Sequence, residues 1–101
     1  MKIPRKLKIG AQTWTVTYSS IIADHGNFDG RTDLSQQNII LDPSLPVDKI
    51  DAVFFHELLH ALLAHTGLDK LIKDYDTIEE GFVTGLSVAL YQVLKDNKLL
   101  K

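Results

Sequence analysis

The chain has 101 residues, of which 45% are hydrophobic and 24% charged, and its formal net charge at pH 7 is -2. This length suits one domain with a single modest core, and the charge gives no reason to expect a nucleic-acid partner. The absence of cysteine excludes disulfides and cysteine metal ligands. No apolar run predicts a membrane span or a secretory signal. We therefore expect one cytoplasmic domain over residues 1–101.

A first β-hairpin is predicted within residues 6–18. Apolar and polar residues alternate there around a glycine-containing turn, which is the period-two pattern of a half-buried strand pair. Trp14, Val16 and Tyr18 lie on one face of the second strand and are expected to be buried as core side chains.

A second hairpin is predicted from strands at 31–34 and 38–41, so that β-hairpins occupy about 6–41. Its last strand is either a free edge, to which an extended peptide could add, or an interior strand. The segment 23–33 has the glycine, asparagine and aspartate density of a loop. His25 lies in this loop, and a lone loop histidine is more often merely exposed than functional.

A long helix is predicted at 46–66. Pro46 suits its first turn, and Gly67 suits a left-handed stop directly after its end. The central part is apolar on nearly every side, which is typical of a buried helix. We therefore expect polar side chains on this helix to line an internal cleft.

The pattern H-E-x-x-H occurs inside this helix as His56, Glu57 and His60. Residues four apart lie on one helical face, so the two imidazoles can bind one ion. Glu57 is rotated by about 100° and can act as a general base beside it. The alternative is a pair of hydrogen-bonded core histidines, but such residues are seldom buried unless paired. His65 points half a turn away from His56 and is not expected to bind the metal.

Catalytic zinc takes three protein ligands, so a third ligand is needed. Besides Glu57, the only glutamates are Glu79 and Glu80. Either can instead cap the second helix, because Asp76 with Glu79 and Thr77 with Glu80 both have the capping spacing of three. The first capping pair leaves Glu80 free, and we favour Glu80 as the ligand while Glu79 stays an alternative.

The second helix is predicted at 77–96 from the spacing of its apolar residues. The segment 67–76 before it is either a short helical turn or a lid. Gly81 and Gly85 lie four residues apart and are expected to let this helix approach the first one closely.

His56-Glu57-x-x-His60 followed by Glu80 resembles the gluzincin class of zinc metallopeptidases. More closely, the chain is similar to small zincin-like proteins of phages and prophages, which are related to the ImmA/IrrE peptidases and similar in size to minigluzincins. The resemblance implies an α+β fold, a minimal zincin-like domain with an N-terminal antiparallel sheet of two hairpins, the metal-binding helix and a second packed helix. It also implies zinc bound by His56, His60 and Glu80. Where that family often has Asn or Asp to support a histidine, this chain has Thr84.

The implied function is hydrolysis of peptide bonds in a specific intracellular protein, with Glu57 taking a proton from water. Tyr75, Tyr91 and His25 are weak candidates for stabilising the oxyanion. The alternative is a non-catalytic or latent zinc-binding phage or prophage protein that acts by protein-protein contact. The intact Glu57 favours the first function, and the small size of the chain favours the second. The sequence leaves the substrate and the oligomeric state open, and other divalent ions also suit this ligand set.

Overall fold

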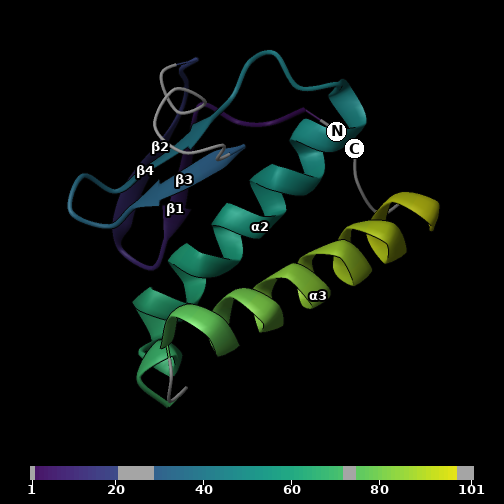
Figure 1. The fold of residues 1–101 in the computed structure, drawn as a ribbon. Coiled ribbons are helices and arrows are strands. Elements are labelled where there is room, and N and C mark those ends of the chain that lie inside the picture. Colours follow the sequence, from purple (N-terminus) through teal and green to yellow (C-terminus); the bar gives the residue numbers. More distant parts are fainter. Residues whose placement is uncertain (1, 21–28, 72–74, 98–101) are drawn as a thin grey trace.

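The structure, a computed structural model, describes residues 2–20, 29–71 and 75–97. It is an α+β fold in which a four-stranded mixed sheet is followed by two long helices (Figure 1). The predicted α+β class is therefore confirmed. In chain order the elements are β1 (Lys6–Ile9), β2 (Gln12–Tyr18), β3 (Gly30–Asp33), β4 (Asn38–Leu41), α2 (Val47–Thr66), the 3-10 turn η1 (Leu68–Leu71) and α3 (Tyr75–Asp96).

The strand order is β1-β2-β4-β3. β1 pairs with β2 and β3 with β4 in antiparallel fashion, but β2 and β4 are parallel. The expectation of an antiparallel sheet throughout is therefore wrong. Ile39 and Leu41 of β4 are both 0% exposed, so the most apolar strand is in the interior, and the polar strand β3 forms the edge. Of the two alternatives for residues 38–41, the interior strand is the correct one.

One face of the sheet packs against α2 and forms the core. Trp14 and Val16 of β2 are 2% and 5% exposed and belong to one buried cluster with β4 and with Phe54 of α2. Tyr18 follows the same alternation but is 48% exposed, which contradicts its predicted burial. It is the last residue of β2 and lies outside the core cluster.

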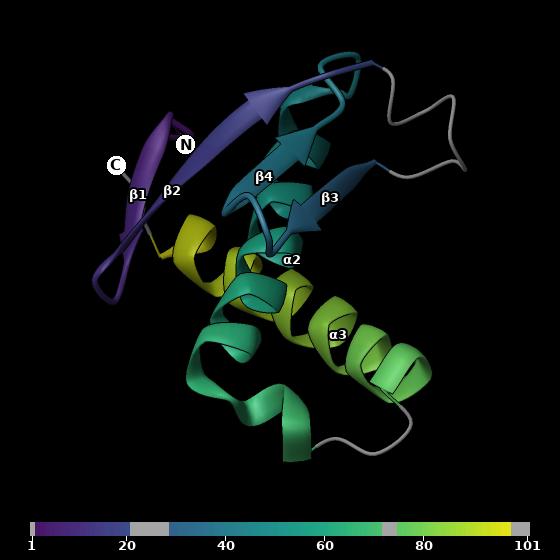
Figure 2. The ribbon, with the colours of Figure 1, turned by 90° about the vertical axis from the view of Figure 1, so that its left-hand side faces the viewer.

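The helix α2 lies between the sheet and α3 (Figures 1 and 2). Pro46 is its N-cap residue, and Gly67 ends it with a left-handed φ of 77°, so the predicted bounds are correct within one residue. On the sheet side Ala61 is 0% exposed. On the other side the ring of Phe55 packs against Tyr91 of α3, with centroids 5.7 Å apart. Burial on two sides explains why the helix is apolar nearly all round.

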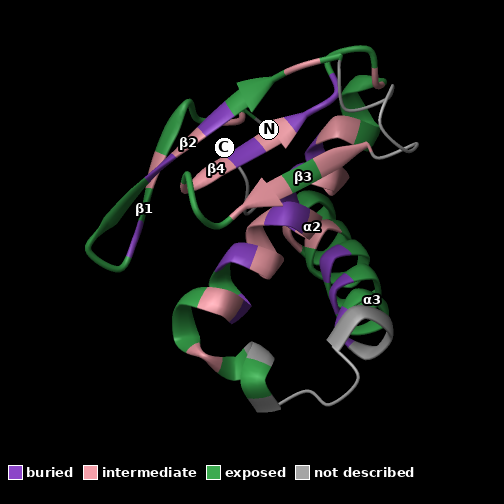
Figure 3. Cartoon of the chain, turned by 60° about the vertical axis from the view of Figure 1, so that its left-hand side comes forward, coloured by how far each residue is buried: buried purple, intermediate pink, exposed green. Residues whose placement is uncertain are grey.

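α3 contacts α2 through a narrow face that includes Val83, 0% exposed, and Ser87, 2% exposed. Gly81 and Gly85 are exposed, and no described atom of another element lies within 4 Å of the position of a Cβ, so the predicted close approach through these glycines is wrong. Much of the outer side of α3 is exposed (Figure 3). Several large apolar side chains lie there, namely Phe82, Leu86, Val88, Leu90 and Val93.

The connection between the long helices contains the short helical turn η1. Of the two predictions for 67–76, a short helical turn or a lid, the structure thus has a helical turn at Leu68–Leu71. Residues 72–74 and the loop residues 21–28, His25 among them, lie outside the described residues. Within the ranges that are described, no helix combines the length and the hydropathy needed to cross a membrane.

Gly30 is expected to be essential for the packing of β3 on α2. A Cβ at this position would lie 2.7 Å from Cγ1 of Val53 and 3.1 Å from Cγ of Glu57. Gly30→Ala should therefore lower the free energy of unfolding by about 1–3 kcal/mol, as overpacking usually does. Urea unfolding followed by circular dichroism measures this change.

Gly85→Ala is the matched control, because nothing lies within 4 Å of that position. Replacing an exposed helical glycine should raise the free energy of unfolding by about 0.5–1 kcal/mol. Equal effects of the two substitutions would contradict the close approach of β3 to α2.

Candidate metal centre

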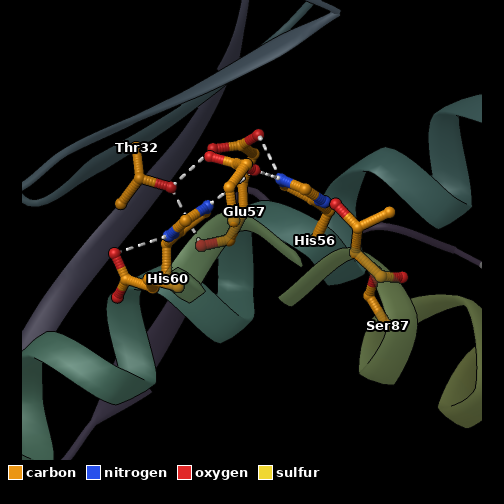
Figure 4. A network of polar contacts seen from close by, with 8 residues as sticks. Thr32, His56, Glu57, His60 and Ser87 are labelled. Atoms are coloured by element: carbon orange, nitrogen blue, oxygen red, sulfur yellow. Dashed lines mark hydrogen bonds and ion pairs between the residues drawn. The ribbon is translucent and has the colours of Figure 1, made fainter. Parts of the chain in front are cut away.

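Two histidines of α2 and one glutamate of α3 converge at one point. Nε2 of His56 lies 2.5 Å from Oε1 of Glu80, and Nε2 of His60 lies 3.2 Å from the same oxygen. The histidines are one helical turn apart, and their rings point to the same place (Figure 4). One donor atom from each of the three residues lies within 4.8 Å of the other two, so this group could hold a metal ion.

The donor set fits a divalent transition metal. Tetrahedral zinc with bonds of about 2.0–2.1 Å needs donor atoms roughly 3.3 Å apart. The separation of 3.2 Å between His60 and Glu80 matches this spacing, whereas the 2.5 Å between His56 and Glu80 is a direct contact that would have to widen around an ion. Two imidazoles and one carboxylate leave a fourth position open, as catalytic zinc sites do. The same donors also suit other divalent metals, so they do not by themselves identify zinc.

The three residues lie at the surface rather than in an internal cleft, which corrects the expectation. The side chains of His56 and His60 are 21% and 18% exposed, and that of Glu80 is 54% exposed. The reason is the position of the histidines on α2, at the border between the side covered by β3 and the side covered by α3. All three side chains are therefore partly accessible to solvent.

Glu57 lies beside this group and is held by the edge strand. It is only 8% exposed, and its Oε2 is 4.0 Å from Nε2 of His56. Oγ1 of Thr32 lies 2.8 Å from Oε1 of Glu57 and 2.9 Å from its backbone oxygen (Figure 4). A hydroxyl group has one proton, so it can donate to the ionised carboxylate. When Glu57 is protonated, the hydroxyl can accept from the carboxyl group and donate to the backbone oxygen.

The two carboxyl groups differ in electrostatics. Burial raises the pKa of Glu57, while the hydrogen bond from Thr32 and the charges of the two histidines offset part of this rise. Burial also acts to raise the pKa of Glu80, but its hydrogen bonds and charge interactions with His60 and His56 outweigh burial and lower it. Glu80 is thus an ionised carboxylate that could bind a metal ion, and Glu57 is a group that can exchange a proton nearer neutral pH.

Glu79, the alternative third ligand, lies apart from the converging atoms. It is 3% exposed, and its Oε2 is 3.6 Å from Nδ1 of His60. Nε2 of the same ring faces Glu80, so the two glutamates lie at opposite nitrogens of His60. The predicted capping pairs depend on the side chains of residues 76 and 77, which are outside the described residues.

Other predicted candidates lie elsewhere. The hydroxyl group of Tyr91 is 3.3 Å from Oδ2 of Asp51, so Tyr91 is directed to the first part of α2 and not to the metal centre. The ring of His65 lies against Gly10, in the turn between β1 and β2, and is not part of the group of donors. The side chain of Tyr75 is outside the described residues.

Thr32 was not found by sequence reasoning. No motif in the sequence distinguishes it from the other threonines in the strands. Its role depends on the strand order, which places β3 at the edge of the sheet and against α2. The alternation within β3 then directs Thr32 to Glu57.

Comparisons with known proteins found no match to this chain among family models, curated proteins or solved structures.

The converging residues are expected to bind one zinc ion per chain, which native mass spectrometry can count. Zinc at 100 times its dissociation constant should stabilise the folded protein by about 2.7 kcal/mol. His60→Ala and Glu80→Ala should abolish most of this stabilisation, because each removes a donor atom.

His65→Ala is the matched control, since it removes a histidine from the same helix that is not in the group. It should leave the zinc content unchanged. A folded wild-type chain that binds no divalent ion would contradict the metal centre.

Proposed function

We propose that the chain is a metal-dependent peptidase, a zinc metalloendopeptidase of the gluzincin type with a minimal zincin-like domain. The observation that carries this proposal is the position of Glu57, a buried carboxylate held by Thr32 beside the donor atoms of His56 and Glu80. A purely structural metal site has no need of a proton acceptor. A hydrolytic site needs one within reach of the attacking water.

When bound, a divalent ion would polarise the scissile carbonyl group and lower the pKa of a water molecule. His56, His60 and Glu80 would hold the ion and leave one side open to substrate. Glu57 takes the proton from the attacking water and returns it to the leaving amine, and its raised pKa makes it a stronger base for the first of these transfers. Thr32 keeps a hydrogen bond to Glu57 in either protonation state.

The edge strand supports an extended peptide as the substrate. β3 has β4 on one side and no strand on the other within the described sheet, and its Thr32 contacts Glu57. A peptide that pairs with the free edge of β3 would run alongside the general base and the metal centre. The backbone hydrogen bonds of such a complex would hold a flexible segment of a protein in the extended conformation that hydrolysis needs.

The second candidate function is a non-catalytic or latent metal-binding protein that acts by protein-protein contact. The observation that favours it is the exposed apolar side of α3, where Phe82 and Val93 are 51% and 46% exposed. The two functions differ in their need for Glu57, which a contact protein does not use.

Glu57→Gln should lower kcat for an unstructured protein such as casein by about 10²–10⁴-fold, the usual contribution of a general base. Glutamine has the same size and retains a hydrogen-bond acceptor for Thr32, but it cannot take a proton. Zinc content and melting temperature, measured on the same samples, should stay near the wild-type values. Hydrolysis that persists in Glu57→Gln would contradict the proposed mechanism, and no hydrolysis by the zinc-loaded wild type would favour the contact protein.

Thr32→Val should move the acidic limb of the pH-activity profile to higher pH. Glu57 must be ionised to accept a proton, so activity is lost as the pH falls through its pKa. The hydrogen bond from Thr32 lowers that pKa, and its removal should therefore raise it. Thr32→Ser retains the hydroxyl group and should keep the wild-type profile. If the acidic limb of the pH-activity profile lies at the same pH in Thr32→Val and Thr32→Ser, this hydrogen bond does not lower the pKa of Glu57.

A further inference from the structure

Glu79 is a buried carboxylate whose one partner among the described residues is His60. Its side chain is 4% exposed, and Nδ1 of His60 lies 3.6 Å from its Oε2. Among the described residues, no other cationic or hydrogen-bonding group contacts this carboxylate. Burying a carboxylate is costly unless it is paired, and the imidazole of His60 is the described group that Glu79 faces.

His60 can bind a metal ion through Nε2 only if that nitrogen carries no proton. In the structure its Nε2 lies 3.2 Å from Glu80, whose ionised carboxylate can only accept a proton. A metal ion at Nε2 would replace that proton and leave the proton of the neutral ring on Nδ1. The tautomer of a histidine is determined by the hydrogen bond that its other nitrogen makes. In metal sites this partner is commonly a carboxylate, which also fixes the orientation of the ring.

We propose that Glu79 is a positioning residue for His60. It accepts the Nδ1 proton of that ring and so directs the Nε2 lone pair to the place where Glu80 and His56 converge. This inference rests on the metal centre of the proposed function. It adds a residue that orients one of the ligands, His60, without binding the metal itself. Because 3.6 Å is longer than a hydrogen bond, the carboxylate must approach the ring by roughly half an ångström when the metal binds.

The support comes from an unexpected position. In the family that the sequence resembles, it would come from four residues after the ligand glutamate, where this chain has Thr84. The side chain of Thr84 is exposed, whereas Glu79 directly precedes Glu80 and is buried against His60. Consecutive helical residues differ by about 100° in direction, so the two glutamates can reach opposite nitrogens of one ring.

The test compares Glu79→Ala, Glu79→Gln and the control Thr84→Ala with the wild type. Zinc dissociation constants are measured by competition with a chelator, and the Nδ1 proton of His60 is observed by nitrogen-15 NMR in the zinc-loaded protein. Glu79→Ala should weaken zinc binding by about 10–100-fold and expose the Nδ1 proton to rapid exchange with water. Glu79→Gln keeps an acceptor oxygen and its size, so it should fold like the wild type and lose less affinity. Thr84→Ala should match the wild type.

Wild-type affinity and a protected Nδ1 proton in folded Glu79→Ala would overturn the positioning role and leave the proposed function intact. A loss of affinity that is equal in Thr84→Ala would also overturn it, because the effect would then not be specific to Glu79. A third outcome is that the wild type binds zinc more tightly than the Glu79 variants, as expected, and yet cleaves no peptide. In that case the peptidase proposal fails while the role of Glu79 stands.

Discussion

The burial of α2 on two sides is the constraint on which the rest of the structure depends. The sheet covers one side of this helix and α3 covers another, and groups from both layers meet the helix at His56, Glu57 and His60. His56 and His60 lie at this meeting point, one turn apart. Because both covering layers supply polar groups there, Thr32 from β3 and two glutamates from α3, the packing of the core also assembles the candidate metal centre.

The environment gives the three glutamates of this chain different chemistry. Glu80 is half-exposed and lies between two imidazoles, so its carboxylate stays ionised and could bind a metal ion. Glu57 is buried next to a single hydroxyl group, and its pKa is raised. Glu79 is buried against the remaining nitrogen of His60. Identical side chains can thus serve as ligand, base and support, because burial and neighbouring charges determine which form of each is stable.

Strand order has consequences for function in this small domain. The parallel pairing of β2 with β4 places the apolar strand β4 in the interior and leaves β3 at the edge. Gly30 allows β3 to lie close to Val53 and Glu57 of α2. Of the two edge strands, β1 and β3, it is therefore β3 that contacts Glu57, the proposed general base.

The sequence by itself determined the α+β class, the strands within 6–41, both long helices and the grouping of His56, Glu57 and His60. These features depend on local periodicity, on Pro46 and Gly67 at the helix ends, and on the spacing of side chains along one helix. Only the tertiary structure decided that β4 is interior, that Tyr18, Gly81 and Gly85 are exposed, and that Thr32 and Glu79 contact the centre. Each of these depends on which elements pack together over long sequence separations, and local patterns do not encode the order of strands or the rotation of one helix against another.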